Sequence, residues 1–83
     1  MMTKIVRAVH AGGRCIELSF SDGVTGVWDG STLLTRTGSL VTPLHEAAYF
    51  NRFFIDAGAL CWPNGLELSP ERLREQITAV EHA

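Results

Sequence analysis

The sequence is short of cysteine, of lysine and of long apolar runs, and each shortage excludes a class of protein. Cys15 and Cys61 are the only cysteines, and their separation matches no CxxC motif of a metal or redox centre. No apolar run approaches the ~18 residues of a membrane span, and residues 1–7 lack the apolar centre of a signal peptide. We therefore expect a cytoplasmic chain with no membrane segment and with both thiols reduced.

Positive charge is also scarce, because Lys4 is the only lysine and the formal net charge is -2. Such a chain has no global positive field that would attract a phosphate backbone. Lys4, Arg7 and Arg14 lie around the first predicted hairpin and are the best candidates for a local basic patch. Nucleic-acid binding is therefore disfavoured, and it stays open as an alternative function.

The remaining composition is that of an ordinary globular protein, with 46% hydrophobic and 19% charged residues. A chain of this length forms one domain, residues 1–83, which buries only about 60 to 65 per cent of its unfolded surface. The patterns follow the order β-β-β-α-β-β-α. They predict a two-layer α+β domain, in which an antiparallel sheet of about five strands carries its helices on one face.

Three strands are predicted in the first half of the chain. The dipeptide Asp22-Gly23 separates the second from the third and favours a two-residue type I′ loop. The strands cover residues 4–10, 14–20 and 24–29.

The register of this first hairpin decides which side chains face the core. A two-residue loop pairs Leu18 with Val27 and Ile16 with Asp29. Val24 and Trp28 then lie on the face opposite to the core.

A second hairpin is predicted around Ala57-Gly58. With a two-residue loop, Ile55 opposes Leu60, and both face the core. Phe54 and Cys61 then share the other face. The two strands cover residues 52–56 and 59–62.

Asp29 is predicted to cap a short helical turn over residues 30–34. A carboxylate can also act in catalysis. We prefer the cap, because no second acid or base lies at a recognisable spacing from Asp29.

Two further helices have clear start signals. Thr42-Pro43 begins a helix of about two turns. Ser69 and Pro70 supply an N-cap and a first helical residue for the last helix. We expect this helix to continue to about Glu81.

The stretch from Trp62 to Gly65 connects the second hairpin to the last helix. Trp62 is expected to face the core, Pro63 cannot donate to a continuing ladder, and Asn64-Gly65 suits a turn. We interpret the stretch as a structural corner in preference to a ligand site.

The predicted faces also define a candidate interface. Val24, Trp28, Phe54 and Cys61 lie away from the core, and a large exposed apolar patch usually marks a contact surface. A protein partner or a homodimer is the simplest use of such a surface. The alternative, that the first strand or the loops cover these residues, stays open.

An enzyme that uses Cys61 or Cys15 as nucleophile, with a histidine as base, is the less favoured alternative. Neither cysteine lies at a predicted helix N-terminus, so nothing visible lowers its pKa. His45 is expected to face water without a nucleophile beside it. We predict no catalytic residue, metal, cofactor or small-molecule ligand.

Two blocks of sequence resemble a known family. The first is Leu18-Ser19-Phe20-Ser21-Asp22-Gly23 with Trp28-Asp29, and the second runs from Pro43 to Leu68 and includes Trp62-Pro63-Asn64-Gly65-Leu66-Glu67-Leu68. They are similar to the pattern of domain-of-unknown-function family 2442, small bacterial proteins. Glu67 departs mildly from it, since many relatives have aspartate there.

The resemblance implies a compact α+β domain without an established activity. Some relatives carry an additional helix-turn-helix domain, and others are encoded beside a second small protein in an arrangement like that of toxin–antitoxin pairs. We expect no helix-turn-helix here, because Ala83 follows soon after the last predicted helix. The resemblance therefore favours a non-enzymatic protein-binding or regulatory module, with an antitoxin-like role as one form of it and a homodimer as the simplest.

Overall fold

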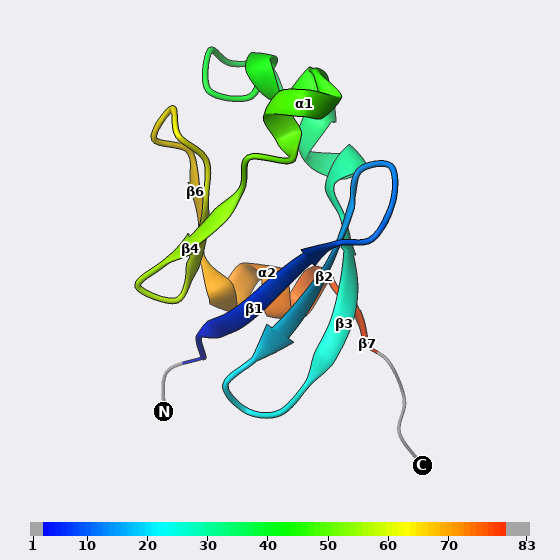
Figure 1. The fold of residues 1–83 in the computed structure, drawn as a ribbon, viewed down its shortest axis with the longest axis vertical. Helices are drawn as coiled ribbons and strands as arrows, with labels where there is room; N and C mark the ends of the chain where they lie inside the picture. Colours follow the sequence, from blue (N-terminus) through cyan, green and yellow to red (C-terminus); the bar gives the residue numbers. More distant parts are fainter. Residues whose placement is uncertain (1–2, 80–83) are drawn as a thin grey trace.

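Two antiparallel sheets that share one apolar core make up the computed structural model, which describes residues 3–79 (Figure 1). The α+β class and the antiparallel pairing are confirmed, but the prediction of a single sheet is wrong. The first sheet has the order β1-β2-β3-β7, with β1 (Ile5–His10), β2 (Cys15–Phe20), β3 (Thr25–Asp29) and β7 (Thr78–Ala79). The second has the order β4-β5-β6, with β4 (Phe54–Asp56), β5 (Ala59–Cys61) and β6 (Glu67–Leu68).

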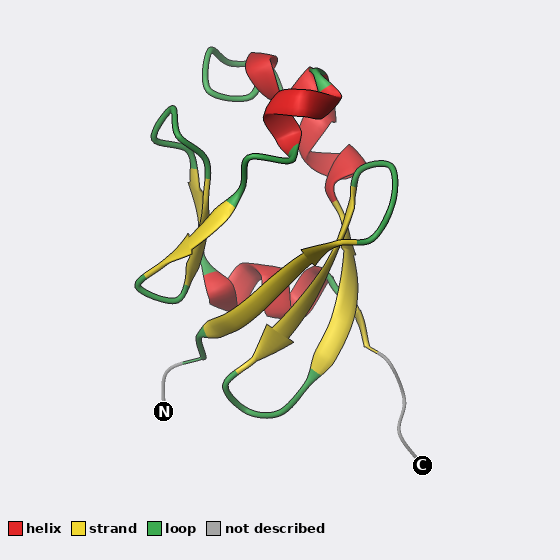
Figure 2. Cartoon of the chain, viewed as in Figure 1, coloured by secondary structure: helices red, strands yellow, loops and turns green. Residues whose placement is uncertain are grey.

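Short helical segments connect these strands. The 3-10 helices are η1 (Gly30–Thr35) and η2 (Thr42–His45), and the α-helices are α1 (Ala47–Phe50) and α2 (Pro70–Gln76). Figure 2 shows η1, η2 and α1 gathered at one end of the molecule, whereas α2 lies apart from them beside the sheets. The helices therefore do not form the single layer that was predicted.

The predicted helix caps at Asp29 and Ser69 are confirmed. Asp29 Oδ1 accepts hydrogen bonds from the backbone N–H of Ser31 (3.0 Å) and from its hydroxyl group (2.7 Å). Ser69 Oγ accepts the backbone N–H of Arg72 (3.3 Å), and Pro70 follows in the first helical turn. Each oxygen thus satisfies an N–H group that has no partner within its helix.

Two helices are shorter than predicted. α2 ends at Gln76 instead of near Glu81, because Ile77 has extended angles (φ -73°, ψ 153°) and the chain then forms β7 against β3. The edge of β3 supplies the backbone partners that further helical turns would have supplied. The rest of the predicted helix, from residue 80 on, lies outside the described residues. The segment from Thr42 is divided at Glu46, whose ψ of 127° separates η2 from α1.

The first hairpin differs from the prediction by one residue. The N–H of Phe20 donates to the carbonyl oxygen of Val24 (2.8 Å), which leaves a three-residue loop, and Gly23 has a positive φ of 89°. This loop is a turn followed by a bulged glycine, not a type I′ turn. Ile16 therefore pairs with Trp28, and β3 is turned over relative to the predicted register. Trp28 lies in the core with 2% of its surface exposed.

The second hairpin has the predicted register. Ala57 and Gly58 both have positive φ angles (53° and 83°), as a type I′ turn requires. Ile55 pairs with Leu60, and Phe54 pairs with Cys61. Phe54 and Cys61 consequently share the outer face of the second sheet.

The core joins the two sheets. The N–H of Ile5 in β1 donates to the carbonyl oxygen of Gly58 in the β4–β5 loop (2.9 Å). Trp62 has the core position predicted for it, with 1% exposure, and its Nε1–H donates to the carbonyl oxygen of Phe50 (2.8 Å). The buried cluster contains Ile5, Ile16, Leu18, Phe20, Trp28, Leu33, Val41, Leu44, Phe50, Leu60, Trp62 and Leu73.

Candidate functional site

The four residues of the predicted interface do not form one surface. Trp28 and Cys61 are buried, with 2% and 6% exposure, and Val24 is half-buried beside the first hairpin loop. Only Phe54 is open to solvent, with 45% exposure. The expectation that Trp28 lies on an exposed face is wrong, because the three-residue loop shifts the register of β3. The structure still places Phe54 beside Cys61.

Phe54 and Cys61 belong to a row of side chains that crosses the outer face of the second sheet. Phe54 pairs with Cys61, and Cys61 pairs with Glu67. Asp56 follows Phe54 by two positions in β4, so its side chain leaves the strand on the same face. We call Phe54, Asp56, Cys61 and Glu67 the acidic face.

A depression with a volume of about 280 Å³ lies over the acidic face. Asp56 and Glu67 are both exposed at its edge. Its other wall comes from the turn after β5, so the predicted structural corner also borders this surface. The lining residues are Phe54, Asp56, Cys61, Trp62, Pro63, Gly65, Leu66 and Glu67.

The charge of the acidic face comes from its carboxylates, because the thiol is neutral. Cys61 Sγ lies 3.7 Å from the carbonyl oxygen of Ala59 and 4.0 Å from Glu67 Oε2. Burial raises the pKa of Cys61, and the negative charges of Glu67 and Asp56 raise it further. Residues 3–79 contain no group of three or more histidine, cysteine, aspartate or glutamate side chains arranged to hold a metal ion.

The turn beside the acidic face is fixed by a short set of hydrogen bonds. The N–H of Trp62 donates to the carbonyl oxygen of Leu66 (2.9 Å), and Gly65 has a positive φ of 95°. Asn64 Oδ1 accepts the N–H of Leu66 (3.1 Å), while its amide group donates to the carbonyl oxygen of Leu40 (2.9 Å). The turn is therefore held both by its own backbone and by the loop before η2.

A second concavity lies between η1 and α2. Trp28 lies at its base, where the indole Nε1–H donates to Gln76 Oε1 (3.0 Å). Arg36 and Arg72 stand at the rim, and both are exposed. Sequence reasoning missed this site, because the two arginines come from distant segments and neither belongs to a motif. Its lining is Trp28, Thr32, Leu33, Arg36, Leu68, Arg72, Leu73 and Gln76.

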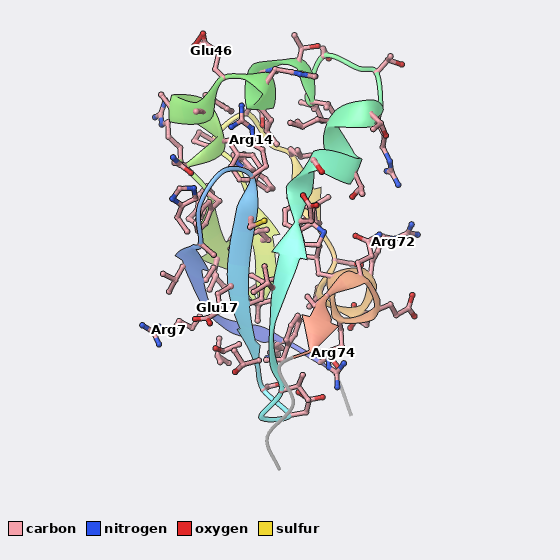
Figure 3. The ribbon with its side chains drawn as sticks, turned by 90° about the vertical axis from the view of Figure 1, so that its right-hand side faces the viewer. Arg7, Arg14, Glu17, Glu46, Arg72 and Arg74 are labelled. Carbon is pink, nitrogen blue, oxygen red and sulfur yellow. The ribbon has the colours of Figure 1, made fainter. Side chains whose placement is uncertain are left out.

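The arginines do not gather into one basic patch. Figure 3 shows Arg7 and Arg14 on other parts of the molecule than Arg72 and Arg74, which both project from α2. Arg14 has a structural role, since its Nη2 donates to the carbonyl oxygen of His45 (2.6 Å) and its guanidinium lies 5.5 Å from the Phe50 ring centroid. Arg14 is therefore engaged in contacts within the domain, and of the predicted basic patch only Lys4 and Arg7 remain.

These features define a small α+β domain of two antiparallel sheets with concavities on its surface. The sequence matches the family described as "Protein of unknown function (DUF2442)" over residues 5–79, and the chain belongs to this family. Comparisons with curated proteins and with solved structures find no match. The family match confirms the resemblance seen in the two sequence blocks. Within residues 3–79, the structure has no helix of the length and apolarity needed to cross a membrane.

Proposed function

We propose that this domain is a non-enzymatic protein-binding module whose acidic face receives a basic side chain of the partner. The observation that carries the proposal is the exposed ring of Phe54, which lines the same depression as Asp56 and Glu67. A depression lined by an exposed aromatic ring and two carboxylates is suited to a lysine or arginine side chain. The partner is therefore a protein segment that presents such a residue.

Each group of the acidic face contributes a different interaction with a cation. The face of Phe54 attracts a guanidinium or ammonium group by about 0.5–1 kcal/mol at an exposed site. A carboxylate adds a charge-assisted hydrogen bond, and an arginine can use both of its terminal nitrogens for it. Cys61 supplies an uncharged base for the depression, because its raised pKa keeps the thiol protonated at neutral pH.

The arrangement argues against the alternative of a cysteine-dependent enzyme. A nucleophilic cysteine needs a lowered pKa, whereas burial and the neighbouring Glu67 and Asp56 raise the pKa of Cys61. Among residues 3–79, no histidine lines the depression around this thiol. His10 lies in the first sheet, where its Nε2 is 3.1 Å from the carbonyl oxygen of Gly13.

The arrangement also argues against nucleic-acid binding at this surface. Phosphate groups are repelled by the carboxylates of Asp56 and Glu67, and the formal net charge of the chain is -2. Arg7 and Arg14 lie away from Arg72 and Arg74 on α2 (Figure 3), so these four arginines offer no continuous track for a backbone. A basic protein segment fits the charge of the acidic face better than a nucleic acid does.

A peptide titration followed by NMR tests the proposal. The probe is a short peptide with one central arginine, and its matched control carries citrulline, which keeps the shape but lacks the charge. We expect the arginine peptide to shift the backbone signals of Phe54, Cys61 and Glu67 in a saturable manner. Replacement of Phe54 by alanine should weaken binding roughly two- to five-fold, in line with an exposed cation–π contact.

Matched variants make the test specific for the acidic face. Glu67→Gln should weaken binding, whereas Glu17→Gln, on the outer face of the first sheet, should leave it unchanged. Equal shifts with the citrulline peptide, or equal loss in both glutamine variants, would contradict the proposal. Sedimentation at several protein concentrations separates a distinct partner from self-association, because a second copy as partner makes the mass depend on concentration.

A further inference from the structure

The geometry points to a second binding site, independent of the acidic face, that takes a small molecule with one apolar group and one carboxylate. The site is the concavity between η1 and α2, which we call the Trp28 groove and define by Trp28, Leu33, Arg36, Arg72 and Gln76. Its base is apolar and its rim is positively charged. A ligand that fits it must combine the two properties.

The base of the Trp28 groove is built from side chains of the core. Trp28, Leu33 and Leu73 are 2%, 6% and 1% exposed, so packing fixes their positions and only a small part of each faces the groove. The groove has a volume of about 110 Å³. The groove is smaller than the cavity of about 150 Å³ that accommodates benzene, so a phenyl ring or a branched alkyl chain enters it only in part.

The rim of the Trp28 groove supplies positive charge from two elements. Arg36 directly follows η1, and Arg72 lies in the first half of α2. In the part of the chain that the structure describes, the only salt bridge joins Arg74 to Asp22, so Arg36 and Arg72 are not neutralised by a carboxylate. In Figure 3, Arg72 extends from α2 away from the body of the molecule. An arginine binds a carboxylate through two parallel hydrogen bonds, which favours a carboxylate over a halide or a neutral group.

The neighbouring polar groups determine how a ligand is oriented in the Trp28 groove. Gln76 Oε1 accepts the Trp28 indole N–H, so the Gln76 amide NH₂ is directed to act as a donor. A second hollow, with a volume of about 270 Å³, adjoins the groove; it shares Trp28, Thr32 and Gln76 but is bordered by Asp29. The carboxylate of Asp29 repels an anion at that end. The carboxylate of the ligand is therefore placed at the arginine end, with its apolar group over Trp28.

The two tryptophans of the chain allow a direct test. Trp28 lies at the base of the groove, whereas the Trp62 indole N–H is hydrogen-bonded to Phe50 in the core. In the ¹⁵N spectrum of the whole chain, the indole signals therefore report on the groove and on a reference site. The Trp28→Phe variant lacks one indole signal, and this loss identifies which of the two signals belongs to Trp28. The probe is phenylacetate, and phenylacetamide is the uncharged control of the same shape.

We expect phenylacetate to shift the Trp28 indole signal saturably and to leave the Trp62 signal in place. Arg36→Gln and Arg72→Gln should each weaken binding by roughly two- to five-fold, as loss of an ion pair at an exposed site predicts. Arg52→Gln is the matched control, because Arg52 is exposed and lies over Tyr49 instead. The inference is overturned if the Trp28 signal does not move, if phenylacetamide binds equally well, or if Arg36 and Arg72 have no effect.

Discussion

Asp22 and Asn64 occupy equivalent positions in two loops that lie far apart in the sequence. The side-chain Oδ1 of each accepts the backbone N–H two residues further on, at 3.1 Å in both loops. Each loop closes between an aromatic residue and the residue four positions later, and each has a glycine with positive φ directly after Asp22 or Asn64. The two sequence blocks that carry the family resemblance thus encode the same kind of hairpin loop twice.

Replacement of the loop glycines by alanine should destabilise the domain through backbone strain alone. Gly23 and Gly65 have φ angles of 89° and 95°, and an added Cβ would meet nothing within 4 Å. We expect Gly65→Ala to reduce the free energy of unfolding by about 1–2 kcal/mol. Gly65→Asn should reduce it less, because asparagine adopts positive φ more readily. Urea unfolding measures both, and equal stabilities would show that the loop relaxes to another conformation.

The two tryptophans should differ in their sensitivity to replacement by phenylalanine. Trp62→Phe leaves the buried carbonyl oxygen of Phe50 without its donor, which costs about 1–3 kcal/mol in addition to the lost packing. Trp28→Phe releases only the side chain of Gln76, which is exposed and can bind water. We therefore expect Trp62→Phe to be the more destabilising change in chemical unfolding. The opposite order would show that water reaches Phe50.

Acid should destabilise the domain by protonating two carboxylates, Asp22 and Asp29, that accept backbone hydrogen bonds. The backbone N–H of Val24 lowers the pKa of Asp22 below its ordinary value of 3.8, with a further contribution from Arg74. The backbone N–H of Ser31 does the same for Asp29, followed by its hydroxyl group. A lowered folded pKa means that the stabilisation is present above pH 3.8 and is lost as the pH falls through the folded value.

The Asp22→Asn/Asp29→Asn double variant tests this pH dependence. Asparagine keeps an oxygen that accepts a hydrogen bond at each position but does not titrate. We expect the Tm of the double variant to fall less steeply than that of the natural chain between neutral pH and pH 3. If the Tm of both proteins falls equally with pH, other groups cause the acid sensitivity.

The two thiols should react at different rates with an alkylating reagent. Cys15 is half-buried at the start of β2, whereas Cys61 is buried and has a raised pKa caused first by burial and then by Glu67. At neutral pH we expect iodoacetamide to modify Cys15 faster than Cys61, as mass spectrometry of each peptide can show. Glu67→Gln should speed the reaction of Cys61, because it removes a negative charge that raises the pKa. A fast reaction at Cys61 in the natural chain would revive the nucleophile alternative.

The hairpins show how far local sequence determines register. Ala57-Gly58 and Asp22-Gly23 both suggest a two-residue loop, but only Ala57-Gly58 forms one. At Asp22-Gly23, the glycine has a positive φ but Asp22 does not, and the Asp22 side chain instead accepts the N–H of Val24. A dipeptide cannot specify which loop forms, because both conformations satisfy its preferences. Burial of Trp28 favours the observed register, and this effect depends on the rest of the core.

The candidate sites were only partly accessible to sequence reasoning. The pairing of Phe54 with Cys61 follows from hairpin geometry and was predicted. The contribution of Glu67 depends on β6, a two-residue strand that has no recognisable pattern of its own. Arg36 and Arg72 come together only because η1 and α2 border the same side of Trp28. Local propensity determines the strands and caps, whereas the surfaces depend on how the sheets and helices pack.

Gly30, directly after β3, has no room for a side chain because α1 packs against it. A Cβ at this position would lie 2.8 Å from the Phe50 ring and 2.9 Å from the carbonyl oxygen of Arg14, so even alanine must displace one of them. The Phe50 ring lies 5.7 Å from that of Trp62, and its carbonyl oxygen holds the Trp62 indole. A single methyl group at position 30 thus presses on a side chain that packs against Trp62, and Trp62 lines the depression over the acidic face.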